Sequence, residues 1–220
     1  MKKYIISMLI IAISFAGCKD NNGPTDNDNP CPECLLIKDI NNCPEITTPT
    51  CIKFDDAITK IPDSLYMAGC SNRNYIVGVC GKNIESVGIF AFTYRQVEWL
   101  CLPNIKHISN YAFRQNLLTT LDLENVEYIG HGAFSNNLLT KLYIPNIKCI
   151  GVNAFSDNPN LTEVHIYTDP ALLELDWYVF PMNTTITVYI KNKNWKSAME
   201  EKFKEYNVVS SDCNVIVEVL

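Results

Sequence analysis

The dipeptide Ala-Phe recurs four times at intervals of 21 residues, and no other feature of the chain constrains its fold as strongly. Its phenylalanines are Phe92, Phe113, Phe134 and Phe155. Apolar residues recur eight and five positions before each phenylalanine, and a Gly or Ser recurs four positions before it. So many matching columns indicate a structural repeat, because chance does not produce them together.

Each unit continues beyond its phenylalanine in the same way. An Asn or Arg follows three residues later, and an apolar run of the type L-x-x-L-x-L comes next. Alternation within this run predicts a short β-strand with one buried face. A unit of this length cannot cover its own apolar columns, so neighbouring units are expected to stack into a solenoid.

Each column has an expected role in the solenoid. We expect the phenylalanines to fill the space between coils and the Gly/Ser column to form a tight turn. The Asn column stands where the chain turns into the strand, so its side chains are expected to satisfy turn backbone groups. The expected architecture is a repeat solenoid of short β-strands joined by turns or short helical segments.

The repeat weakens toward both ends, as the capping units of an array require. A worn unit after the regular ones is expected from Leu172, Leu175, Val179, Phe180, Val188 and Ile190. A worn unit before them is expected from Ile58, Ile61, Leu65, Tyr66, Ile76 and Val79. Regular repeats are thus expected over 84–190, after a Cys-rich N-terminal cap over 31–83. Residues 191–220 are expected to form a small α/β cap, with a helix capped by Asn194 and a final strand over 215–220.

The repeat resembles a known class of leucine-rich repeat. Its pattern is I-x-x-I-G-x-x-A-F followed by L-x-x-L-x-I-P, shown most fully by Ile129, Gly130, Ala133, Phe134, Leu139, Leu142, Ile144 and Pro145. This pattern is similar to that of the BspA-like leucine-rich repeat family and covers about residues 58–190. Members are typically surface or secreted proteins of host-associated bacteria and some protozoa, and many are regarded as adhesins. The resemblance implies a binding role without naming a ligand.

Residues 1–17 carry the features of an export signal. Lys2 and Lys3 precede an apolar run over 4–16 that is too short to span a bilayer as a helix. The run ends in Ala16-Gly17-Cys18, which resembles the cleavage site of bacterial lipoproteins. The resemblance implies cleavage before Cys18 and lipid attachment to it, whereas the alternative is an ordinary secretory signal.

Residues 18–30 contain no large apolar residue after Cys18 and are expected to be a flexible tether. A lipidated cysteine followed by an Asp/Asn-rich tether resembles outer-membrane lipoproteins of the Bacteroidetes. The resemblance implies a location in the cell envelope, with the membrane contacted through the N-terminal lipid. It indicates less directly that the protein faces the cell surface.

Six of the ten cysteines are crowded before the regular repeats: Cys31, Cys34, Cys43, Cys51, Cys70 and Cys80. An exported chain favours disulfides among them, and zinc held through the C-x-x-C of the first two is the alternative. The pairing of the first four stays open, because four cysteines allow three connectivities. Cys70–Cys80 is the one specific pair predicted. Cys101 and Cys149 occupy different outward columns and are not expected to pair with each other.

Outward positions of a solenoid form continuous columns, and exposed aromatic residues in them are typical of recognition surfaces. The candidate ligand-binding residues are Trp99, Asp122, Tyr143, His165 and Tyr128. A glycan would use Trp99, Tyr143 and Tyr128 as a stacking platform. The alternative is that these are ordinary solvated residues of a sheet face.

Composition and motifs narrow the function further. The formal charge of −6, from 18 basic and 24 acidic residues, argues against nucleic acid as a partner. The three histidines fall in different columns, so no zinc site is expected, and no phosphate-binding, dinucleotide-binding or nucleophile-elbow motif occurs. No cofactor or catalysis is expected. The sequence favours a lipid-anchored protein that binds a protein ligand on host or neighbouring cells. A glycan-binding accessory lipoprotein and a purely architectural envelope protein are the alternatives.

Overall fold

The structure is a computed structural model, and it describes residues 34–40, 50–65, 76–205 and 213–220. These ranges belong to one compact unit, Glu33–Leu220. The expected signal peptide, the tether and Cys18 lie outside the described residues, as do Cys31, Cys43, Cys70 and Tyr66. The expectations for those residues therefore stay predictions.

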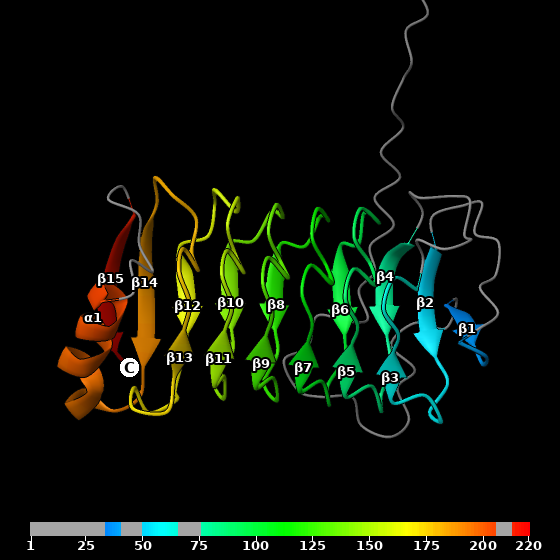
Figure 1. Cartoon of the computed structure of the whole chain (residues 1–220), viewed down its shortest axis with the longest axis horizontal. Coiled ribbons are helices and arrows are strands. Elements are labelled where there is room, and N and C mark those ends of the chain that lie inside the picture. Colours follow the sequence, from blue (N-terminus) through cyan, green and yellow to red (C-terminus); the bar gives the residue numbers. More distant parts are fainter. Residues whose placement is uncertain (1–33, 41–49, 66–75, 206–212) are drawn as a thin grey trace, which may run out of the picture. The chain divides into compact units, whose positions relative to one another are not determined.

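Short parallel strands follow one another in chain order along this unit (Figure 1). The first sheet contains β1 (Leu35–Ile37), β2 (Thr50–Phe54), β4 (Ile76–Cys80) and β6 (Trp99–Cys101). The second sheet contains β8 (Thr120–Asp122), β10 (Lys141–Tyr143), β12 (Glu163–His165), β14 (Thr185–Ile190) and β15 (Asn214–Val219). The third sheet contains β3 (Lys60–Ile61), β5 (Ser86–Val87), β7 (His107–Ile108), β9 (Tyr128–Ile129), β11 (Cys149–Ile150) and β13 (Glu174–Leu175).

Each regular coil contributes one strand to the third sheet and one to the first or second sheet. Equivalent residues of successive units are register partners, as Leu121 and Leu142 are in β8 and β10. One repeat unit in the sequence therefore corresponds to one step from a strand to the next parallel strand of the sheet. This arrangement confirms the expected repeat solenoid.

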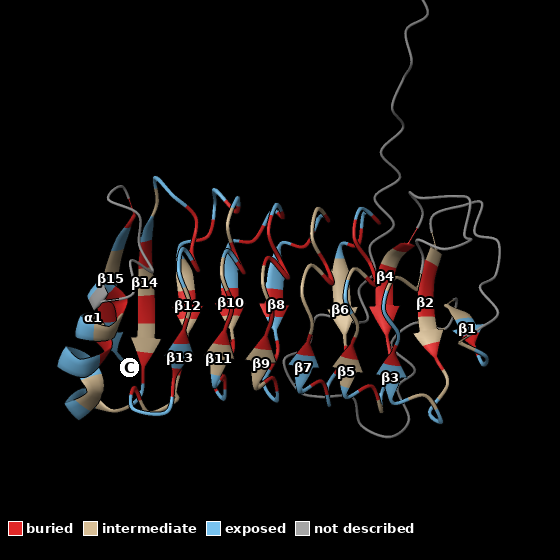
Figure 2. Ribbon diagram, viewed as in Figure 1, coloured by how far each residue is buried: buried red, intermediate tan, exposed pale blue. Residues whose placement is uncertain are grey.

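The phenylalanine column forms a stack through the centre of the coils. Ring centroids lie 5.2 Å apart between Phe92 and Phe113, 5.5 Å between Phe113 and Phe134, and 5.7 Å between Phe134 and Phe155. The rings are fully buried and nearly parallel, which is the offset arrangement that aromatic rings favour. Figure 2 shows buried positions recurring in every coil along the unit. The expected interior role of the column is confirmed.

The buried asparagines after each phenylalanine join consecutive coils. The Asn137 amide donates to the carbonyl of Phe113 at 3.0 Å and accepts from the backbone N–H of Leu118 at 3.2 Å. Asn116 and Asn158 make the equivalent pairs of bonds. Their expected role in satisfying backbone groups is confirmed, and the groups they satisfy include those of the preceding coil.

A second asparagine ladder, which the sequence reading missed, runs along exposed turns. Its members donate to a backbone carbonyl of the preceding coil at 2.8–2.9 Å, and they are Asn83, Asn104, Asn125 and Asn146. They stand nine residues before each phenylalanine, so the column was visible in the alignment of the repeats. Two ladders of asparagines therefore join consecutive coils in the regular part of the array.

The Gly/Ser column has a different role from the turn expected of it. A Cβ on Gly130 would lie 2.7 Å from the backbone nitrogen of Asn110, so glycine is required there by close approach of the preceding coil. The nearest set of left-handed backbone positions comes two residues later, at Phe90, Tyr111, Gly132 and Asn153, where φ is 55–58°. The tight turn therefore lies two residues after the Gly/Ser column, and not at the column itself as expected.

The N-terminal part extends the solenoid further than expected. Strands β1 and β2, which the sequence reading missed, pair in parallel, and β2 pairs with β4. Ile76 and Val79 supply β4 as expected, and Ile61 lies in β3. Ile58 and Leu65 pack against the core as partly buried residues.

The C-terminal part of the chain corrects two expectations, one in the worn last unit and one in the cap. Leu172 is 69% exposed and Leu173 takes the buried place, because the longer unit shifts the chain before Leu175 by one residue. A 3₁₀ turn, Lys193–Trp195, precedes helix α1 (Lys196–Glu205). Asn192 caps this 3₁₀ turn, because its side chain accepts a hydrogen bond from the Asn194 backbone N–H. Asn194 is therefore not the cap.

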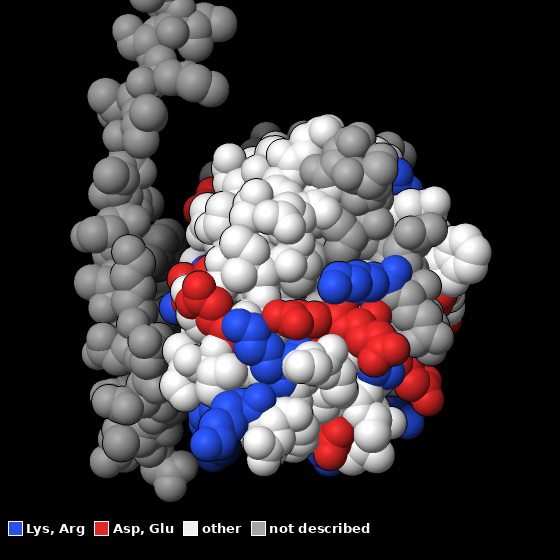
Figure 3. Space-filling view, turned by 90° about the vertical axis from the view of Figure 1, so that its left-hand side faces the viewer, with Lys and Arg blue, Asp and Glu red and all other residues white. Residues whose placement is uncertain are grey.

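Helix α1 closes the end of the core. Phe203 packs on Phe180 at 5.9 Å between ring centroids, and Met199 is also buried. Seen from this end, side chains of both charges alternate across the middle and lower part of the outer face (Figure 3). A polar outer face is what a terminal cap of a solenoid requires.

Candidate functional site

An aromatic row, defined here as Tyr143, His165 and Tyr189, crosses the second sheet on its outward side. His165 is the register partner of Tyr143 in β10 and of Tyr189 in β14. Leu142, Val164 and Val188, the residues before them, are fully buried, so the alternation of the strands turns the row outward. The His165 ring centroid lies 5.8 Å from that of Tyr143 and 4.9 Å from that of Tyr189.

Tyr167 and Lys191 border this row. The ring of Tyr167 meets Tyr143 edge-on at 5.8 Å and His165 edge-on at 6.1 Å between centroids. The Lys191 ammonium lies 4.3 Å from the Tyr167 ring centroid, within range of a cation–π interaction. Three aromatic rings, an imidazole and a cation thus form one packed surface.

Hydrogen bonds hold the imidazole of His165 at both nitrogens. Its Nε2 lies 2.6 Å from Glu163 Oε1, and its Nδ1 lies 3.1 Å from the Tyr167 hydroxyl. An ionised carboxylate can only accept, so Nε2 donates a proton to the hydrogen bond with Glu163. Lys141 Nζ contacts the same Glu163 oxygen at 2.6 Å. The bonds from His165 and then Lys141 lower the pKa of Glu163. The two bonds of the imidazole hold the His165 side chain in its orientation within the row.

Asp122 extends the row at one end, since it is the register partner of Tyr143. Burial and then the nearby Glu124 raise the pKa of Asp122. Burial likewise raises the pKa of Tyr143. Of the five predicted binding residues, the structure therefore brings together Asp122, Tyr143 and His165.

Trp99 and Tyr128 lie elsewhere. The Trp99 indole covers Gly78 of the neighbouring strand so closely that a Cβ there would clash with it. Tyr128 lies in the third sheet, where its ring stacks on His107 at 4.3 Å between centroids. The glycan platform expected from Trp99, Tyr143 and Tyr128 does not form, because Tyr128 belongs to a different sheet from Tyr143.

Tyr189, Tyr167 and Lys191 are the members of this surface that the sequence reading missed. Tyr189 lies between Val188 and Ile190, the two residues assigned to a strand, so alternation alone indicated its outward direction. Tyr189 does not align with Tyr143 and His165 at the 21-residue period, because the last unit is longer than 21 residues. Tyr167 and Lys191 follow strand ends and carry no repeat signal.

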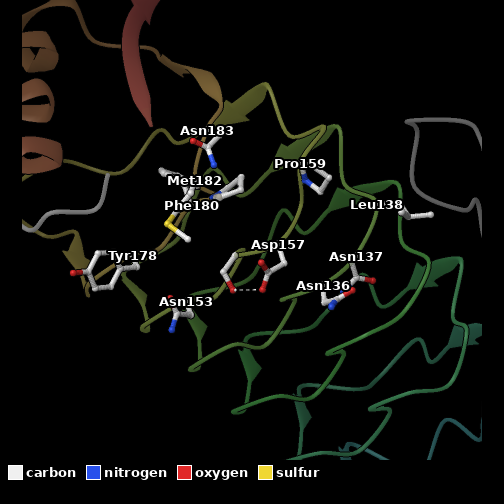
Figure 4. A pocket seen from close by; sticks show the side chains of 12 residues that line it. Asn136, Asn137, Leu138, Asn153, Asp157, Pro159, Tyr178, Phe180, Met182 and Asn183 are labelled. Carbon is white, nitrogen blue, oxygen red and sulfur yellow. Dashed lines mark hydrogen bonds between the residues drawn. The ribbon is translucent and has the colours of Figure 1, made fainter. Parts of the chain in front are cut away.

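A separate groove lies along the turns near the C-terminal coils (Figure 4). Its volume is about 660 Å³, and its exposed lining residues are Asn136, Leu138, Asn153, Asp157, Pro159, Tyr178, Met182 and Asn183. Asn153 and Tyr178 have left-handed backbone conformations, as do Asn136, Asp157 and Asn183. The tight turns therefore project side-chain amides and the Tyr178 ring into one open groove.

One disulfide joins Cys34 to Cys51, which resolves part of the connectivity left open. Cys34 is consequently not available as a thiolate for zinc. The predicted Cys70–Cys80 pair stays a prediction, since Cys70 lies outside the described residues. Cys80 is the register partner of Cys101 in the adjacent strand. Within the described ranges, no group of three or more His, Cys, Asp or Glu residues is placed to bind a metal ion.

The fold and its repeat define a class, the parallel leucine-rich repeat solenoids. The family model for the BspA type leucine rich repeat region matches residues 59–187 in six copies, and the chain belongs to this family. No curated protein matches the sequence significantly.

Two solved structures are similar. The pneumococcal vaccine antigen PcpA is 21% identical with a TM-score of 0.52, and the match covers 76% of this chain and 41% of PcpA. A leucine-rich repeat protein from Eubacterium ventriosum is 17% identical with a TM-score of 0.47, covering 62% of this chain and 42% of that one. This chain thus spans about two fifths of each neighbour, and the PcpA match supports the fold alone. Among the described residues, no helix is long and apolar enough to cross a membrane.

Proposed function

We propose that this chain binds a protein partner through the aromatic row and the residues that border it. The observation that carries the proposal is the contact of Tyr143, His165 and Tyr189 on the outward side of three paired strands. Aromatic residues that stay partly exposed beside charged ones are typical of binding hot spots. Leucine-rich repeat domains generally mediate protein binding, which agrees with this assignment.

The partner is proposed to be a protein on host or neighbouring cells, and the role to be non-catalytic adhesion. The proposed location is the cell envelope, with the chain anchored by a lipid on Cys18 and facing the cell surface. Support for the anchor is the sequence alone: Lys2 and Lys3, the apolar run and Ala16-Gly17-Cys18.

Binding is tested by biolayer interferometry of the chain against immobilised fibronectin, fibrinogen and laminin. We expect at least one to bind, and Tyr143→Ala or Tyr189→Ala to weaken that binding about tenfold or more, as hot-spot residues do. Tyr94→Ala is the matched control, because Tyr94 is 54% exposed and lies outside the row. No binding to any of the three, or equal effects of row and control variants, argues against the proposal.

The anchor has its own test. Cells expressing the chain are fed an alkyne analogue of palmitate, and the chain is then probed for the label. We expect the wild-type chain to be labelled and Cys18→Ser to lose the label. An unlabelled wild-type chain contradicts the lipid anchor without affecting the proposed binding surface.

Glycan binding is the second candidate, and the groove near the C-terminal coils favours it. Exposed amides and a carboxylate offer the donors and acceptors that vicinal hydroxyls need, and the Tyr178 ring, 41% exposed, offers an apolar face. Trp177 lies beside Tyr178, at 6.5 Å between ring centroids, so its fluorescence reports on the groove. Titration with neutral hexasaccharides should change this fluorescence in the wild type and not in Tyr178→Ala. An unchanged signal with every sugar excludes the candidate.

A further inference from the structure

Two cysteines that are 21 residues apart in the sequence are direct neighbours in the fold. Cys80 of β4 and Cys101 of β6 are register partners in a parallel pair of strands (Figure 1). Register partners point to the same side, and neighbouring strands lie about 4.8 Å apart. This spacing is within the range of about 4.4–6.8 Å that disulfides span between Cα atoms.

The environment of the two thiols differs in a way that assigns them separate roles. Cys80 is 3% exposed, whereas Cys101 is half-buried and reachable from solvent. The pKa of Cys101 is lowered to about 7, first by a hydrogen bond from the Cys80 thiol and also by the Lys53 cation, against the opposing effect of burial. Lys53 is the register partner of Cys80 on its other side, so the cation stands in the same row. At neutral pH, Cys101 is therefore an accessible nucleophile, and the thiol of Cys80 lies beside it in the adjacent strand.

The other cysteines with described thiols lack this environment. Burial raises the pKa of Cys149, and nearby Glu174 and Asp176 raise it further. Burial also raises the pKa of Cys213. Cys149 lies in the third sheet between Tyr128 and Glu174, so no cysteine is its register partner.

We propose that Cys80 and Cys101 are a redox pair that a small-molecule disulfide oxidises to a cross-strand disulfide. The Cys101 thiolate attacks one sulfur of the oxidant, such as oxidised glutathione, and expels one thiolate to leave a mixed disulfide. Cys80 then loses its proton and attacks Cys101 Sγ, which expels the second thiolate. Two protein thiols are oxidised, one disulfide is reduced to two thiols, and the protons pass to the two released thiolates.

The product joins β4, in the N-terminal part of the solenoid, to β6, the first strand that the regular repeats contribute to this sheet. The other disulfide, Cys34–Cys51, ends in β2 of the same sheet. Both cross-links thus lie where the repeat is weakest, and the second one closes a whole coil. A cross-link of this kind restricts the unfolded chain and is expected to raise resistance to urea.

The test uses the full chain, reduced and then exposed to glutathione buffers of increasing oxidised fraction. Samples are alkylated, digested and mapped by mass spectrometry. We expect a cross-linked peptide pair containing Cys80 and Cys101, and a glutathione adduct on Cys101 at early times. Cys80→Ser should trap that adduct, because the resolving thiol is gone, while Cys149→Ser should oxidise as the wild type does.

Three outcomes overturn the proposal. One is a digest in which Cys80 is joined to Cys70. Another is a Cys101 glutathione adduct that persists in the wild-type chain, since Cys80 would then fail to resolve it. The third is a wild-type chain whose Cys101 remains an alkylatable thiol throughout. Far-UV circular dichroism of both variants confirms that they are folded, and Cys80→Ala replaces Cys80→Ser if the hydroxyl disrupts the buried site.

Discussion

Replacing Asn137 by Ala tests whether the buried asparagine ladder holds the coils together. Asn137 is 3% exposed, and its amide serves two coils at once. After truncation, the Leu118 N–H and the Phe113 carbonyl lose the partner that Asn137 supplied. The Phe134 carbonyl keeps a bond from Asn158, so it is not left unsatisfied.

The size of the effect follows from these two groups. Each buried backbone group without a hydrogen bond costs about 1–3 kcal/mol, which gives about 2–6 kcal/mol for the variant. Asn125→Ala is the matched control, because it also removes one inter-coil asparagine. Its single bond, to the Pro103 carbonyl at 2.8 Å, is exposed to solvent, and water replaces it. The control should therefore lose about 1 kcal/mol or less.

Urea denaturation followed by far-UV circular dichroism measures both variants against the wild type. The reasoning requires the free energy of unfolding of Asn137→Ala to fall below that of Asn125→Ala by more than about 1 kcal/mol. Equal losses would mean that burial of the ladder adds nothing. The coils would then be held by the phenylalanine stack and the sheets alone.

Three further predictions follow. Gly130→Ala should destabilise the chain by about 1–3 kcal/mol in urea, because the new Cβ meets the preceding coil, whereas Ser109→Ala in the same column should be nearly neutral. The pKa of Glu163 is lowered in the fold, so its stabilisation is present at neutral pH and is lost as pH falls through that lowered pKa. The Tm difference between wild type and Glu163→Gln should accordingly shrink on acidification, and a constant difference contradicts the assignment. Alkylation of Cys101 should reach half its maximal rate near pH 7, and Cys149 should need a higher pH.

The sequence was most informative where the repeat is regular. Phe113 and Phe134 recur at one period because each ring must meet the same ring of the next coil, so their stacking was predictable. The strands around Leu121 and Leu142 were predictable for the same reason. A regular period couples local pattern to long-range packing, which a single strand or helix does not do.

The structure of the terminal parts was harder to predict from the sequence, because these parts pack against only one neighbouring coil. Strand β2 has no sequence period to align with, although Ile52 and Phe54 alternate as a strand does. Leu172 and Leu173 are both apolar, and only the path of the longer unit decides which one is buried. The binding surface divides similarly: Tyr143 and His165 follow the repeat, whereas Tyr167 reaches them from beyond a strand end.

The ladder of buried asparagines also gives the array a direction of growth. Each amide donates to the coil before it, as Asn158 does to the Phe134 carbonyl, so a coil supplies the bonds that complete its predecessor. An in-phase duplication of one unit, such as residues 116–136, therefore inserts a coil whose own Asn donates to the preceding coil. The Asn of the following coil donates in turn to the inserted one. The outward row would lengthen by one strand spacing at each such event. The length of this outward surface is thus set by the number of repeat units. Recombination between repeats can change that number without any change to the residues of the core.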